Sequence, residues 1–140
     1  EDPDGVRASA AELEKLIARE NARGIDDGRI VLAGFSQGGA IALHTGLRHA
    51  APLAGILALS TYLPLADRLA LEVSDANLDT PIFMAHGYDD GVIGFAHSQA
   101  SCKLLIDSGY PVEWHAYQME HAVCMEEVRD ISAWLRTTLA

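Results

Sequence analysis

The Gly-Phe-Ser-Gln-Gly-Gly segment at residues 34–39 constrains the possible fold more than any other part of this sequence. It follows a short apolar run at 30–33 and precedes an Ala-Ile-Ala-Leu stretch at 40–43 that is typical of a helix. A strand, a Gly-x-Ser-x-Gly turn and a helix in that order are typical of a nucleophile elbow, which lifts the serine hydroxyl clear of a sheet. Because so tight a turn leaves no room for a β-carbon beside the serine, it predicts a steric need for Gly34 and Gly38. On its own, the pentapeptide also fits a glycine-rich turn of any α/β protein.

Acidic residues and a histidine follow the serine in the order found in α/β-hydrolases, which is serine, acid, histidine. Asp89 and Asp90 come just after an apolar run at 81–85, and His121 comes just after the run 112–117. Open parallel sheets place their functional side chains beyond the carboxyl ends of the strands. We therefore expect the serine, one of the two aspartates and the histidine to meet at that edge of the sheet.

Predicted strands and helices alternate along the whole chain. The predicted strands cover residues 30–35, 53–59, 82–85 and 112–117. The predicted helices cover residues 6–23, 37–49, 95–108 and 124–139, with a further short helix at 66–71. This alternation predicts the α/β class, with a doubly wound parallel sheet flanked by helices. Apolar and polar residues alternate in the last strand, which favours a place near the sheet edge, and the length of 140 residues predicts a single domain, 1–140.

Five stretches of the chain resemble the carboxylesterase and acyl-protein thioesterase family of α/β-hydrolases, most of all its small bacterial carboxylesterases. They are residues 29–40, 57–64, 86–90, 117–121 and 130–135. The Phe-Ser-Gln-Gly-Gly form of the elbow is far more specific than Gly-x-Ser-x-Gly alone. The resemblance implies a serine carboxylesterase that cleaves esters or thioesters of small or lipid-like acyl groups through an acyl-enzyme, with no metal or organic cofactor.

The same resemblance assigns roles to three side chains. It implies that Ser36 is the nucleophile, Asp90 the acid that orients the base, and His121 the general base. The acid of the family stands four positions after the histidine of a His-Gly pair, here His86, which selects Asp90 over Asp89. Asp89 is then expected to be a solvated or turn residue.

Two further parts of a site are implied by the resemblance. The backbone N–H of Gln37 would donate to the oxyanion, since it lies at the start of the helix after the elbow. Tyr62 and Leu63 match a family segment near the acyl pocket, which makes them candidate substrate-binding residues. Both also fit loop residues that only cover the core, and the sequence leaves the two interpretations open.

Family members begin with strands and with a His-Gly-Leu-Gly-type loop that donates the second N–H of the oxyanion hole. This sequence has no counterpart of them, so the resemblance implies a partial α/β-hydrolase fold, the C-terminal two thirds, with the N-terminal strands missing. We expect an apolar sheet edge that associates with the missing N-terminal segment or with a second copy, and little activity for the chain alone. The alternative function is a non-catalytic α/β-hydrolase-like module for binding or dimerisation.

The net charge and the two cysteines indicate which partners and which cellular compartment to expect. A formal net charge of −10 argues against nucleic acid and against anionic membrane surfaces as partners. Cys102 and Cys124 lie far apart and form no C-x-x-C pair, which favours free thiols in a reducing compartment, the cytoplasm. No stretch of the sequence has the pattern of a signal peptide or of an integral membrane segment.

Two other kinds of site fit the sequence less well. A metal site would need His86, Asp89, Asp90 and His121, but no H-x-x-x-H or C-x-x-C spacing supports it. A dinucleotide-binding loop would need Gly-x-Gly-x-x-Gly, which residues 34–39 do not provide. It would also need an acidic residue about 20 positions later at a strand end, and none is found there.

Overall fold

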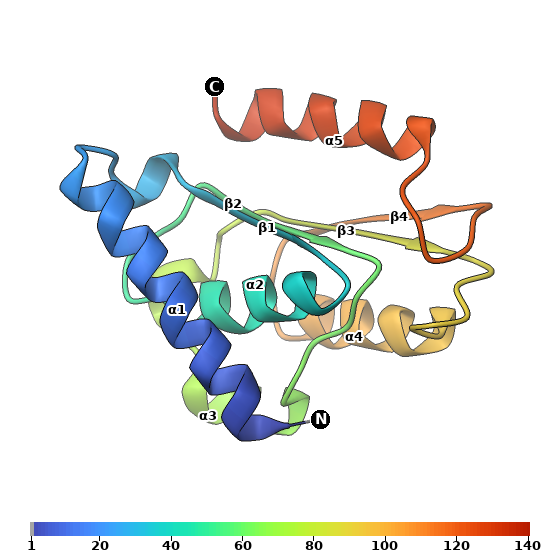
Figure 1. Cartoon of the computed structure of the whole chain (residues 1–140), viewed down its shortest axis with the longest axis horizontal. Coiled ribbons are helices and arrows are strands. Elements are labelled where there is room, and N and C mark those ends of the chain that lie inside the picture. Colours follow the sequence, from blue (N-terminus) through green and yellow to red (C-terminus); the bar gives the residue numbers. More distant parts are fainter. Residues whose placement is uncertain (1) are drawn as a thin grey trace.

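Four parallel strands form the sheet of the computed structural model, which describes residues 2–140 (Figure 1). In order across the sheet they are β1 (Val31–Phe35), β2 (Gly55–Leu59), β3 (Ile82–Gly87) and β4 (Val112–Tyr117). The predicted parallel sheet is therefore confirmed, and so is the place of the last strand at its edge. Because all four strands run the same way, their carboxyl ends lie side by side at one end of the sheet. Phe35, Leu59 and Ala85 are in register there.

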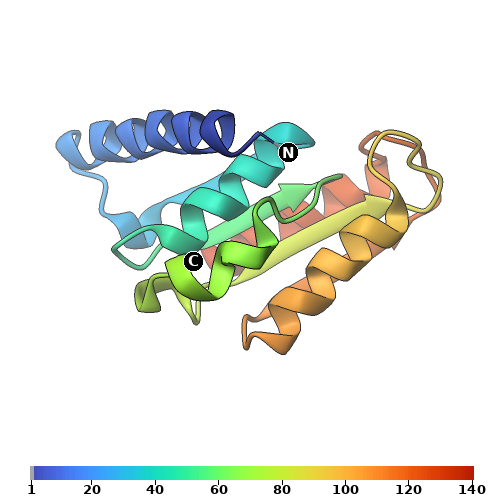
Figure 2. The same cartoon turned by 90° about the horizontal axis from the view of Figure 1, so that it is seen from below.

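Helices cover both faces of this sheet. α5 (Met125–Thr138) lies on one face, whereas α2 (Gln37–Arg48) and α4 (Phe95–Asp107) lie on the other (Figure 1 and Figure 2). The first helix, α1 (Pro3–Ala22), packs against α2, and the one-turn helix α3 (Leu69–Glu72) lies on the same side of the sheet (Figure 1). Within residues 2–140, no helix combines the length and the apolarity that crossing a bilayer requires.

Several predicted boundaries differ from the structure, among them the end of β3, which lies at Gly87 rather than at residue 85. The first helix begins at Pro3 rather than at residue 6, because proline is well accommodated at the first helical position. β2 begins at Gly55 rather than at residue 53, and the N–H of Leu53 donates to the Asn77 side chain at 2.8 Å instead of to a neighbouring strand. The short helix predicted at 66–71 is a 3₁₀ turn, Ala66–Arg68, followed by α3.

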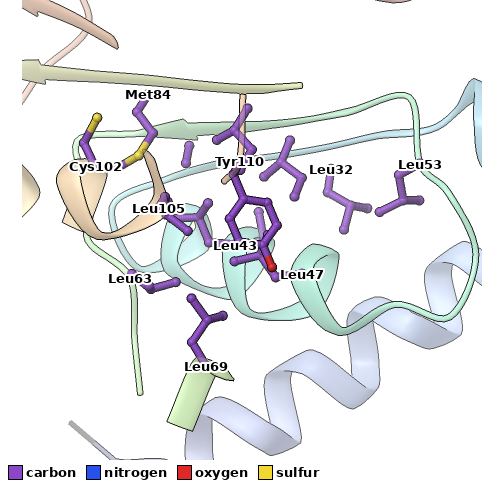
Figure 3. Close-up of a cluster of buried hydrophobic side chains, with 14 of the residues drawn as sticks. Leu32, Leu43, Leu47, Leu53, Leu63, Leu69, Met84, Cys102, Leu105 and Tyr110 are labelled. Carbon is purple, nitrogen blue, oxygen red and sulfur yellow. The ribbon is translucent and has the colours of Figure 1, made fainter. Parts of the chain in front are cut away.

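The side chains of β3 alternate between the two faces and so divide the core in two. Ile82 and Met84 face α2 and α4, where they join a cluster that includes Leu43, Leu47 and Leu105 (Figure 3). Phe83 and Ala85 face α5 and pack with Trp134. All six residues of β3 are buried. The loop that follows β3 therefore starts from a strand that is packed on both faces.

Candidate active site

The turn between β1 and α2 holds Ser36 in a backbone conformation that residues other than glycine rarely adopt. Its φ and ψ are 58° and −122°, and holding a residue with a β-carbon in such a region costs about 1–3 kcal/mol. Backbone hydrogen bonds secure the turn on both sides. The N–H of Ser36 donates to the Leu59 carbonyl at 2.8 Å, and the Ser36 carbonyl accepts from the N–H of Gly39 at 3.0 Å. Ser36 thus stands beyond the carboxyl end of β1, as the elbow pattern predicts.

Two glycines make this turn possible. The sequence pattern predicts only one of these two correctly. A β-carbon at Gly34 would overlap the backbone carbonyl of Gly38, which confirms the steric need for Gly34. The matching prediction for Gly38 is wrong, because a β-carbon there would meet no described atom within 4 Å. The second constrained position is Gly39, where a β-carbon would lie 2.7 Å from Cγ2 of Thr61 and 2.9 Å from the Gly34 carbonyl oxygen.

We expect Gly34→Ala to destabilise the protein by about 1–3 kcal/mol, because backbone atoms rather than a flexible side chain must move to admit the methyl group. Gly38→Ala is the matched control on the same turn. It should change the free energy of unfolding by no more than about 1 kcal/mol, and in the stabilising direction, because alanine is favoured over glycine in a helix. Denaturant unfolding of the two variants measures both values. Equal losses would contradict the steric account of the elbow.

The structure brings Ser36, Asp90 and His121 into one line of hydrogen bonds. Asp90 lies in the loop after β3 and His121 in the loop after β4, and these loops lie together beyond the carboxyl ends of the strands (Figure 1). His121 Nε2 is 3.0 Å from Ser36 Oγ, and His121 Nδ1 is 2.7 Å from Asp90 Oδ2. Since an ionised carboxylate only accepts, Nδ1 carries the ring proton and Nε2 is left free to accept a proton from the Ser36 hydroxyl.

Asp90 is a buried carboxylate with a donor at each oxygen. Its side chain is 0% exposed. Oδ1 accepts the backbone N–H groups of Val92 and Ile93, both at 2.8 Å, while Oδ2 accepts from His121. Burial alone would raise the pKa of Asp90, but the hydrogen bonds from His121, Ile93 and Val92 together hold that pKa below its usual value. Asp90 is therefore ionised at neutral pH and able to stabilise a positive charge on His121.

The neighbouring aspartate, Asp89, makes different contacts. It is exposed, and its carboxylate accepts a hydrogen bond from the side-chain amide of Gln118. Its backbone N–H donates to the Met119 carbonyl at 3.1 Å. Asp89 thus joins the loop after β3 to the loop after β4 at the surface, and Asp90 is the member of the pair that reaches His121.

Two residues that the sequence analysis did not assign to the site support the loop that carries His121. A β-carbon at Gly87 would overlap the carbonyl oxygens of Met119 and Glu120, so only glycine allows the loop to lie this close to β3. Ser60 has a φ of 52°, and its Oγ donates to the Ala122 carbonyl at 3.4 Å. The position of Ser60 in the sequence could have pointed to it, since Ser60 follows β2 as Ser36 follows β1.

The remaining predicted site residues lie around this line of hydrogen bonds. Gln37 is the first residue of α2, so its N–H belongs to the helix turn that has no intrahelical acceptor. Tyr62 is half-buried and its ring stacks on His97, with 4.7 Å between the ring centroids. Leu63 is only 2% exposed and lies in the core beside α2 and α4 (Figure 3). This burial favours, for Leu63, the core-covering interpretation that the sequence left open.

The four residues of the alternative metal site do not all come together in the structure. Asp90 Oδ2 lies between His121 Nδ1, at 2.7 Å, and His86 Nε2, at 3.3 Å, whereas Asp89 points to the surface loop. Among residues 2–140, no group of three or more histidine, cysteine, aspartate or glutamate side chains is placed to hold a metal ion.

Comparison with known proteins finds similar sequences over nearly all of this chain. The sequence profile of the phospholipase/carboxylesterase family matches residues 1–139. The acyl-protein thioesterase 1 of Neurospora crassa is 42% identical over 99% of this chain and 58% of its own length. The acyl-protein thioesterase 1 of Yarrowia lipolytica is 38% identical over 99% of this chain and 63% of its own length.

Solved structures show the same fold. Arabidopsis thaliana SOBER1 superposes with a TM-score of 0.93 at 28% sequence identity, over 99% of this chain and 67% of that structure. The chain spans about 60% of the length of the curated relatives it matches. The likeness is therefore nearly complete for this chain and partial for each relative.

Proposed function

Because this chain belongs to the phospholipase/carboxylesterase family, we propose that its protein is a serine hydrolase of carboxylic esters or thioesters. The substrates we propose carry small or lipid-like acyl groups. The thioester part draws on relatives whose name is acyl-protein thioesterase 1. The observation that carries the proposal is the unbroken line of hydrogen bonds from Ser36 through His121 to Asp90.

In the proposed acylation step, Ser36 Oγ attacks the carbonyl carbon of the substrate while its proton passes to His121 Nε2, 3.0 Å away. The imidazole becomes positively charged, and the ionised Asp90, 2.7 Å from Nδ1, stabilises that charge and keeps the ring oriented. The electron pair of the carbonyl double bond moves to its oxygen. The backbone N–H of Gln37, at the positive end of α2, donates a hydrogen bond to this oxyanion.

Collapse of the tetrahedral intermediate then completes the exchange. The alcohol or thiol leaves and takes the proton from His121 Nε2, while the acyl group remains on Ser36 Oγ as an ester. Water attacks the acyl carbon in the second half of the cycle, with His121 as the base. Departure of the carboxylic acid returns the proton to Ser36, and the three side chains are restored.

The non-catalytic alternative fits the elbow less well. A module that only binds or dimerises has no use for a serine held at a φ of 58°, a conformation that costs about 1–3 kcal/mol. It also has no use for a carboxylate held in its ionised form beside an imidazole. Strain and shifted protonation that converge on one group of residues are typical of catalytic sites.

The location that we propose is the cytoplasm. Cys102 and Cys124 are both free thiols in the structure. Cys102 is buried, and its burial raises the pKa of the thiol. Unpaired cysteines are usual in reducing compartments, and a thiol with a raised pKa is a poor nucleophile.

Acyl-enzyme trapping tests the proposed function. The protein expressed from its complete gene is mixed with p-nitrophenyl esters of increasing acyl length and with the matching thioesters. The reaction is quenched in acid and digested for mass spectrometry. We expect turnover of at least one acyl length and an acyl group on the peptide that contains Ser36. An acyl group on another residue, or the absence of turnover across the whole series, would contradict the proposal.

A further inference from the structure

His86 is a buried imidazole that the chemistry above does not use. It lies near the end of β3 and is 0% exposed. Its Nε2 is 2.7 Å from the carbonyl oxygen of Ile93 and 3.3 Å from Asp90 Oδ2. The Ile93 carbonyl is its hydrogen-bond partner and can only accept, so Nε2 must carry the proton of the ring.

The other ring nitrogen supports the same assignment. Nδ1 of His86 is buried and has no hydrogen-bond partner within residues 2–140. A proton on Nδ1 would therefore be a buried donor without an acceptor in the part of the chain that the structure describes, which is costly. The surroundings favour the tautomer with its proton on Nε2, and this N–H donates to the Ile93 carbonyl.

Ile93 links the imidazole of His86 to the carboxylate of Asp90 through its two backbone groups. Its N–H donates to Asp90 Oδ1 at 2.8 Å, while its carbonyl accepts from His86 Nε2 at 2.7 Å. His86 belongs to a strand that is packed on both faces, whereas Asp90 and Ile93 belong to the loop after it. The imidazole therefore fastens the loop to the sheet at the place where the carboxylate must point toward His121.

We propose that His86 is a positioning residue for hydrolysis, because its Nε2–H holds the Ile93 carbonyl and thereby the loop whose N–H groups orient the Asp90 carboxylate toward Nδ1–H of His121. The inference rests on the proposed function, and His86 itself touches none of the reacting atoms. Without this N–H, the Ile93 carbonyl loses its donor, and the loop that brings the Ile93 N–H to Asp90 Oδ1 is held less firmly. The carboxylate then turns away from His121 more easily, and the positive imidazole of the transition state is less stabilised. The loss therefore falls on kcat rather than on KM.

Glutamine and methionine at position 86 form a matched pair for the test. The amide nitrogen of glutamine is as many bonds from the β-carbon as Nε2 of histidine, so His86→Gln keeps an N–H donor at this place. His86→Met has a side chain of similar length and no donor. Both variants are made in the protein expressed from its complete gene. Turnover of a p-nitrophenyl ester is measured per folded molecule, with the folded fraction taken from near-ultraviolet circular dichroism.

We expect His86→Met to lose about 10- to 100-fold in kcat, because leaving a partly buried carbonyl without its donor has effects of this size. KM should stay within about twofold, since no contact with the substrate is removed. His86→Gln should stay within about threefold of the unaltered kcat. A merely structural role would not be restored by a donor at one atom, so the difference between the two variants is the decisive quantity.

The possible outcomes separate this inference from the proposed function. Equal kcat values for the two variants, or a loss confined to KM, overturn the inference while the unaltered protein remains an active esterase. An unaltered protein without ester or thioester turnover overturns the proposed function and this inference together. A measurement without variants is the nitrogen-15 NMR spectrum of the histidine rings, in which His86 should show a proton on Nε2. A proton on Nδ1 with Nε2 bare would overturn the inference even if neither variant folds.

Discussion

Ser36→Ala should lower kcat for ester hydrolysis by a factor on the order of 10⁶, because removal of the nucleophile of a serine hydrolase has an effect of that size. The reason lies in the geometry of the elbow. Ser36 Oγ is the atom 3.0 Å from His121 Nε2, and alanine leaves the imidazole with no hydroxyl to activate. Steady-state turnover of a p-nitrophenyl ester by the protein expressed from its complete gene measures the loss.

A fluorophosphonate probe provides a second readout of the same substitution. Its phosphorus forms a bond with Ser36 Oγ and releases fluoride, so the unaltered protein should carry one label and Ser36→Ala none. Ser60→Ala is the matched control, because Ser60 also has a positive φ at the end of the neighbouring strand. It should still be labelled at Ser36. Undiminished labelling of Ser36→Ala would show that another residue is the nucleophile.

Asp90→Asn should lower kcat by a factor on the order of 10⁴, the effect known for replacement of the orienting acid in serine hydrolases. The amide oxygen of the asparagine should occupy the Oδ1 position, because Val92 and Ile93 donate their N–H groups there. The amide nitrogen must then face His121 Nδ1 at the Oδ2 position. As a donor, it reverses the tautomer of His121 and leaves a proton on Nε2, which can no longer accept the proton of the serine hydroxyl.

Asp89→Asn is the matched control, one residue away and of the same chemistry. Asp89 is exposed and contacts Gln118, so the kcat of Asp89→Asn should stay within about threefold of that of the unaltered protein. The kinetic constants of both variants are compared on one ester at one pH. An equal or larger loss for Asp89→Asn would show that the orienting acid has been misassigned.

The fold and the elbow could be predicted because their signals are local. A strand, a glycine-flanked serine and a helix that follow one another directly leave few other conformations for residues 31–40. The steric need for Gly34 was predicted correctly for the same reason, since its obstacle lies four residues away in the same turn. The prediction of Gly38 as the second constrained glycine was wrong. The constrained position is Gly39, which is crowded by Thr61, a residue beyond the next strand. No spacing in the sequence reveals that contact.

The residues around the site were predicted less well than the meeting of Ser36, Asp90 and His121. Tyr62 and Leu63 are adjacent in sequence, yet Leu63 packs in the core and Tyr62 stacks on His97 in the first turn of α4. Whether a loop side chain faces the core or the substrate depends on how the chain bends after β2, which composition does not encode locally. The roles of Gly87 and Ser60 depend in the same way on carbonyl groups of the loop after β4.

The sequence by itself determined the order of the elements, the parallel sheet and the identity of the residues that reach one edge of it. Periodicity and turn chemistry act over a few residues, and the rules of parallel sheets then bring the carboxyl ends of the strands together. Only the tertiary structure decided which atoms meet there: Asp90 Oδ2 with His121, Asp90 Oδ1 with two backbone N–H groups, and His86 Nε2 with Ile93. A hydrogen bond is lost when its atoms move apart by about 1 Å, and distances of that size depend on the packing of the whole core rather than on sequence spacing.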